Sequence, residues 1–92
     1  METEQLEELI NQTINGTMLT IPAYLSEIDQ NKSELKIDNS KEFVYGMIMG
    51  MSLGMASAFL TAEKGMPTQE DQLKIRDLVY QKMPEVREKI YE

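Results

Sequence analysis

The sequence contains neither cysteine nor histidine, and these two absences exclude several kinds of site. Without cysteine there is no disulfide framework, no zinc finger and no thiol nucleophile, and the redox state of the compartment cannot be inferred. Without histidine the chain lacks the commonest general base and the Glu-x-x-His pattern of di-iron helical bundles. Walker A and GxGxxG patterns are also missing, so nucleotide binding has no support.

Basic residues are few in the first half of the chain. Residues 1–42 hold nine acidic and three basic side chains, whereas residues 63–92 hold seven and six, within a net charge of −7. This balance predicts no nucleic-acid partner and favours a basic protein instead. The 92 residues predict one helical domain over 1–92, of a size at which oligomerisation is a usual source of stability.

The longest uncharged stretch runs over residues 43–62 and contains twenty residues. A helix of this composition has no charged face, so we expect other surfaces to cover it on all sides. Small residues recur at every fourth position of the stretch, which lets another helix backbone approach closely. Projected around a helix, most of these small residues and their polar neighbours fall in one sector. We predict that this sector is a helix-packing or oligomer interface, made of Gly46, Gly50, Gly54, Ser57, Ala58 and Thr61.

The same stretch allows a membrane interpretation, because about twenty uncharged residues match the roughly 30 Å hydrocarbon core of a bilayer. Only six of the twenty are Leu, Ile, Val or Phe, which weakens insertion. Lysines flank both ends, so the sequence has no positive-inside bias. No signal peptide is expected, because the first long apolar run begins past residue 40. We therefore favour a cytoplasmic protein over the alternative of a small single-pass membrane protein or accessory subunit spanning 43–62.

Apolar spacing and capping residues predict four helices, at about 3–15, 21–31, 40–64 and 69–91. Asn15-Gly16 should end the first helix, and Pro22 suits the first turn of the second. The segment 29–38 is predicted to be a linker.

The third and fourth helices have clear end signals. Asn39 and Glu42 have the spacing of a capping box, and Gly65 offers a left-handed position beyond the third helix. Thr68 is the expected N-cap of the fourth helix. Pro84 should kink or break that helix near 83–84.

Two clusters of side chains could bind a metal ion, but for both of them a structural role is the stronger interpretation. Four methionines lie close together in the uncharged stretch: Met47, Met49, Met51 and Met55. Their thioethers could bind a soft metal ion such as Cu(I), but methionine opposite glycine usually fills gaps in a core. Five carboxylates lie near the N-terminus and in the second predicted helix: Glu4, Glu7, Glu8, Glu27 and Asp29. They could bind a divalent metal ion, but an acidic helix start is usually a solvent-exposed face. We therefore predict no catalytic, cofactor or metal residues.

Together these patterns predict an all-α, three- to four-helix bundle-like domain with a central apolar, glycine-rich helix, completed by dimerisation. The predicted function is a noncatalytic protein-protein interaction or scaffold module that acts as a homodimer or higher oligomer. A third, weaker possibility is a carboxylate-dependent metal enzyme, which metal analysis of the purified protein would test.

Overall fold

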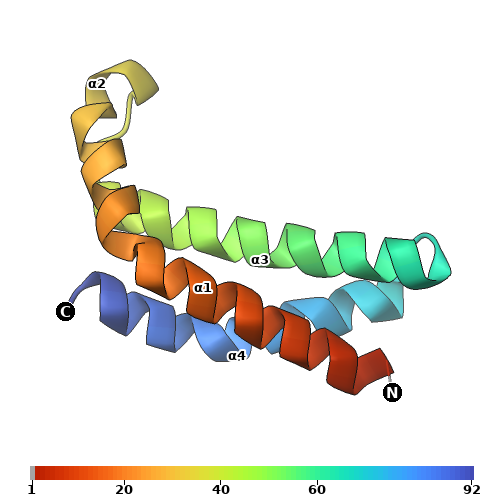
Figure 1. Cartoon of the computed structure of the whole chain (residues 1–92). Helices are drawn as coiled ribbons and strands as arrows, with labels where there is room; N and C mark the ends of the chain where they lie inside the picture. The colour runs from red at the N-terminus through yellow and green to blue at the C-terminus, as the bar shows by residue number, and fades with distance from the viewer. Residues whose placement is uncertain (1) are drawn as a thin grey trace.

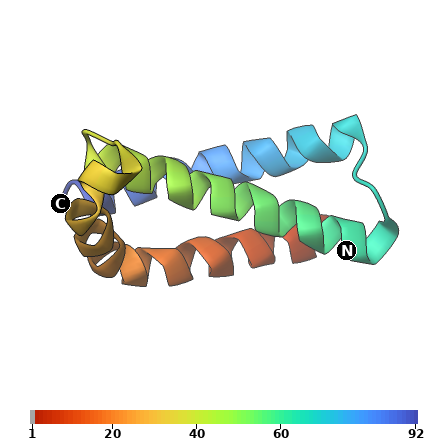
Figure 2. The same cartoon turned by 90° about the horizontal axis from the view of Figure 1, so that it is seen from above.

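The computed structural model describes the backbone of residues 2–92 and the side chains from Glu4 onward. This part of the chain forms α1 (Glu2–Gln30), α2 (Lys32–Leu35), α3 (Ser40–Lys64) and α4 (Gln69–Ile90), with no strand. Each of the three long helices contacts the other two. In Figure 1, α3 lies above α1 and α4, and in the view from above it lies between them (Figure 2). The single turn of α2 lies at one end (Figure 1). The predicted all-α, bundle-like fold is confirmed.

The first helix differs from the prediction, because α1 is one continuous helix where two were expected. Gly16 has no positive φ angle, and Pro22 lies inside the helix. One unbroken face of α1 is buried on both sides of these residues, and a break would expose half of it. Burial of that face outweighs a glycine cost of about 1 kcal/mol and a proline cost of about 3 kcal/mol. The buried face consists of Leu6, Ile10, Ile14, Thr17, Ile21 and Ile28.

The proline still affects the shape of α1. The helix changes direction in the region of Pro22, so that its last turns lead away from the bundle towards α2 (Figure 1). A proline removes one backbone donor and clashes with the preceding turn, which is the usual cause of such a bend. The predicted linker is also partly helical, since α2 occupies residues 32–35 and ends at Lys36, whose φ is 58°.

The bounds of α3 agree with the predicted 40–64. The backbone N–H of Glu42 donates to Asn39 Oδ1 at 3.1 Å, which confirms the N-cap. The reciprocal half of the capping box does not form, because the Glu42 carboxylate binds Arg87 and Tyr91 instead. Gly65 has the predicted positive φ of 89°, but its ψ of −162° lies outside the left-handed helical region.

The fourth helix begins as predicted, with a full capping box between Thr68 and Asp71. Pro84 does not break the helix, because α4 continues through it to Ile90. The predicted kink near 83–84 stays a prediction. Val79, Met83 and Val86 are buried on either side of the proline, and this packing holds the two halves of the helix on the core. The buried face of α4 consists of Ile75, Val79, Met83, Val86 and Ile90, with Leu78 half-buried beside it.

Candidate interaction surface

Only one side of α3 takes part in the core. Every fourth residue of the helix is buried, and these side chains meet α1 and α4: Val44, Ile48, Ser52, Ala56 and Leu60. The Ser52 hydroxyl donates to the Ile48 carbonyl at 2.9 Å, so a buried polar group is satisfied within the helix itself. Within the chain, α1 and α4 cover only one side of α3 and leave the opposite side in solvent, so the covering expected there would have to come from outside the chain.

The predicted interface residues lie on that exposed side. Ser57 is half-buried and the other five, including all three glycines, are exposed. A Cβ atom added at Gly46, Gly50 or Gly54 would have no neighbouring atom within 4 Å. These glycines therefore do not mediate a close helix contact within the chain. Their role in an interface between copies stays a prediction.

Large apolar side chains share this exposed side. Phe43 and Met51 are each 38% exposed and Met55 is 51% exposed. The twenty residues between Lys41-Glu42 and Glu63-Lys64 carry no charge. We call this uncharged exposed side of α3 the outer face.

The outer face contains a regular row that sequence reasoning missed. Six residues along it are spaced alternately by four and three positions: Phe43, Met47, Gly50, Gly54, Ser57 and Thr61. Four of them are exposed, while Ser57 is half-buried and Met47 is half-buried against the core. This alternation averages 3.5 residues, so the row runs almost straight along the helix and has the spacing of a coiled-coil seam. The glycines and Ser57 concealed the pattern, because a search for apolar heptads does not count small residues.

Among the described residues, α3 is the one helix long and apolar enough to cross a bilayer. Only 28% of its most apolar stretch is buried within the molecule. A core helix of a soluble protein is usually covered much more completely, so the fold leaves open what covers the outer face.

The charged residues at the ends of α3 are held by α4. Arg87 Nη2 lies 2.6 Å from Glu42 Oε2, and the Tyr91 hydroxyl donates to the same carboxylate. The hydrogen bond from Tyr91 and that from Arg87 lower the pKa of Glu42 below its usual value, while the bond to Glu42 raises the pKa of Tyr91. At the other end, Lys64 Nζ lies 3.2 Å from an oxygen of Asp71. Glu42 and Lys64 are thus paired within the chain.

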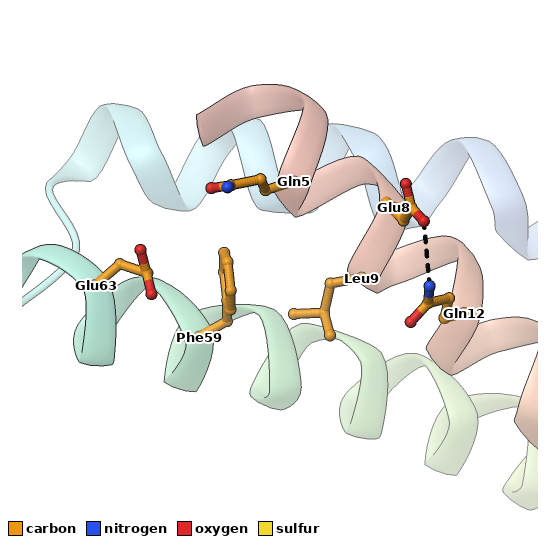
Figure 3. Close-up of a pocket in the computed structure, with 6 residues that line it drawn as sticks. All are labelled: Gln5, Glu8, Leu9, Gln12, Phe59 and Glu63. Carbon is orange, nitrogen blue, oxygen red and sulfur yellow. Dashed lines mark hydrogen bonds between the residues drawn. The ribbon is translucent and has the colours of Figure 1, made fainter. Parts of the chain in front are cut away.

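A groove of about 320 Å³ lies between α1 and α3, away from the outer face. Leu9 and Phe59 form its apolar wall, and the Phe59 ring points towards α1 (Figure 3). Glu8 on α1 and Glu63 on α3 supply a carboxylate from each side, and Gln12 Nε2 donates to Glu8 Oε1 at 3.2 Å (Figure 3). The groove combines negative charge with an apolar wall, which suits a basic side chain with a long aliphatic stem.

Within residues 4–92, no group of three or more acidic side chains is close enough to hold a metal ion. Of the four clustered methionines, Met47 and Met49 are half-buried and pack against the core as predicted, whereas Met51 and Met55 face solvent.

Comparison with protein-family models, curated proteins and solved structures finds no match for this chain. Its function therefore has to be inferred from its own residues and their arrangement.

Proposed function

We propose that the protein is a noncatalytic interaction module that acts as a homo-oligomer, and that its copies associate through the outer face of α3. The observation that carries this proposal is the exposure of a long, uncharged helix side that bears Phe43, Met51 and Met55. Contiguous exposed apolar surface on a soluble protein usually marks an interaction site. Removing it from water contributes about 25 cal/mol per Å² of apolar area.

The size of the chain supports the same proposal. A bundle of three long helices in 92 residues has a thin margin of stability, and association is a usual way to increase it. The three outer-face glycines further support a close helix contact, since no side chain stands between their backbone and an approaching helix.

A basic protein is the proposed partner of the resulting oligomer. The groove between α1 and α3 offers Glu8, Glu63 and the apolar wall of Leu9 and Phe59 to such a partner. Attraction between opposite charges speeds association and is screened over about 10 Å at 0.1 M ionic strength, so association should slow as salt rises. Affinity capture at low and high salt tests this part.

The alternative is a single-pass membrane protein spanning 43–62, and the low burial of α3 favours it. The buried side of α3 argues against it, because Val44, Ile48 and Leu60 pack on α1 and α4. Insertion of α3 would have to separate it from these helices or draw the charged α4 towards the bilayer. We therefore propose the soluble, cytoplasmic form as the functional one.

The test of self-association is the solution mass in buffer without detergent, measured by light scattering at micromolar concentration. We expect a dimer or higher oligomer. A cooperatively folded monomer would contradict the proposal, and recovery only in the membrane fraction would favour the alternative.

Glycine variants test whether the oligomer forms through the outer face. Gly50→Leu and Gly54→Leu should keep the helical fold, because a Cβ at either position has no packing neighbour within 4 Å, but should lower the oligomer mass. Gly16→Leu is the matched control, since Gly16 is also exposed, helical and free of neighbours within 4 Å, but lies on α1. An oligomer that survives both outer-face changes would show that another surface mediates association.

A further inference from the structure

We propose that the second copy docks on the outer face in an antiparallel orientation, about a two-fold axis that crosses this face at the level of residue 52, between Gly50 and Gly54. This inference rests on the proposed function, since it specifies how two copies use the face assigned there. In this arrangement Phe43 meets Thr61 of the second copy, Met47 meets its Ser57, and Gly50 meets its Gly54.

The row of six outer-face residues makes this register possible. Positions 43 and 61, 47 and 57, and 50 and 54 lie at equal distances on either side of residue 52. A two-fold axis at that point therefore places the row of one copy directly on the row of the other. Such an isologous contact closes on itself and yields a dimer rather than a filament.

The sizes of the side chains decide between the two orientations. Bulk is concentrated at one end of the row, in Phe43 and Met47, while the other end carries the smaller Ser57 and Thr61. The antiparallel register pairs each large residue with a small one and distributes the bulk equally over both ends, so the helices approach most closely at the central glycine layers. Interfaces reach high packing density only where the two surfaces complement each other in this way.

The parallel register fails on the same residues. It would place Phe43 on Phe43 and Met47 on Met47, and would leave glycine, serine and threonine layers at the opposite end. The bulky layers would force the helices apart at their N-terminal ends and leave voids between the small layers.

The charges at the ends of α3 favour the same orientation. Glu42 is neutralised by Arg87 and Lys64 by Asp71, which leaves Lys41 at one end and Glu63 at the other. Lys41 Nζ lies 5.1 Å from the centre of the Tyr91 ring and stays exposed, as does Glu63. Antiparallel docking sets the end with Lys41 beside the end with Glu63, whereas parallel docking sets like charges at the same end.

Spin-label distances test the orientation, and the absence of cysteine makes single-site labelling clean. Labels at Ala62→Cys and Ala58→Cys lie ten and six residues from the axis. With a rise of 1.5 Å per residue, the two copies of each label should be separated along the helices by about 30 Å and about 18 Å. A parallel dimer would give one short distance, near the helix separation of about 10 Å, at both positions.

A size-exchange series gives a second readout that does not depend on labels. Thr61→Phe should weaken the dimer about tenfold or more, because it would meet Phe43 of the second copy. Phe43→Thr combined with Thr61→Phe restores one large and one small residue in each layer and should recover most of the affinity. Failure of the double change to recover affinity would contradict the antiparallel layers.

The light-scattering mass of each sample separates the possible failures. Dimers with two equal short distances, or with no recovery in the double variant, would overturn the antiparallel inference and leave the proposed function standing. Folded monomers in plain buffer, or dimers that form only in lipid vesicles, would overturn both.

Discussion

Arg87 Nη2 lies 2.6 Å from Glu42 Oε2, and this pair joins the C-terminal end of α4 to the N-terminal end of α3. The Tyr91 hydroxyl donates to the same carboxylate, and the Arg87 guanidinium lies 5.1 Å from the centre of the Tyr91 ring. Tyr45 offers a second ring to Arg87, at 4.8 Å. The four side chains form one contact cluster. Hydrogen bonds from Arg87 and Tyr91 stabilise the negative charge of Glu42, and the two tyrosine rings stabilise the positive charge of Arg87.

The first prediction concerns the acid side of the stability curve. Because Tyr91 and Arg87 lower the pKa of folded Glu42, this group contributes stability above its usual pKa, and the contribution is lost as the pH falls through the folded value. The free energy of unfolding of the Glu42→Gln variant should therefore decrease less than that of the parent protein as the pH falls from about 5 to about 3. Urea denaturation across this range measures the effect. Glu85→Gln, an exposed carboxylate on α4, is the control and should follow the parent curve.

The second prediction concerns the proline inside α4. Pro84 is exposed, and its ring removes one backbone hydrogen bond from a helix that continues to Ile90. Pro84→Ala should raise the free energy of unfolding by about 1 to 3 kcal/mol, as the missing bond forms and the clash disappears. Pro67 lies in the connection before α4, so Pro67→Ala should produce no such gain. Equal effects of the two changes in chemical denaturation would contradict this account.

The third prediction concerns two glycines with opposite requirements. Gly16 is exposed within α1 and has free space around its Cα, so Gly16→Ala should stabilise the protein by about 0.5 to 1 kcal/mol. Gly65 has a φ of 89°, which other residues adopt only with strain, so Gly65→Ala should destabilise it by about 1 to 2 kcal/mol. Thermal or urea denaturation of the two variants should give shifts of opposite sign.

The fourth prediction concerns the acidic start of α1. Glu4 and Glu8 are exposed, and Glu8 accepts a hydrogen bond from Gln12 at 3.2 Å. The double variant Glu4→Gln and Glu8→Gln should change the unfolding free energy by less than about 1 kcal/mol, with or without added divalent cations. A large loss of stability that divalent ions reverse would indicate a metal site in this region.

Local chemistry in the sequence was enough to locate most helix ends. Asn39 and Thr68 act as N-caps because their side-chain oxygens accept from the backbone within one turn, a geometry that depends on the neighbouring residues alone. The apolar spacing of α4 likewise identified its buried side, since a helix repeats every 3.6 residues whatever surrounds it.

Local signals failed where distant parts of the chain outweighed them. Asn15-Gly16, Pro22 and Pro84 all disfavour a helix, but each lies between buried residues that pack on other helices. Glu42 has capping-box spacing, yet its carboxylate is taken by Arg87, which is 45 positions away in the chain. A pattern of a few neighbouring residues reveals neither the contacts with distant helices nor the distant charged group that competes for the carboxylate.

By itself, the sequence determined an all-helical chain, its caps and an uncharged third helix, because these follow from residue type and short-range spacing. Tertiary structure alone decided which side of that helix is buried. The helix is uncharged all round, so its own pattern favours no side, and the choice follows from where α1 and α4 pack. That packing buries the row from Val44 to Leu60 and leaves the glycines in solvent.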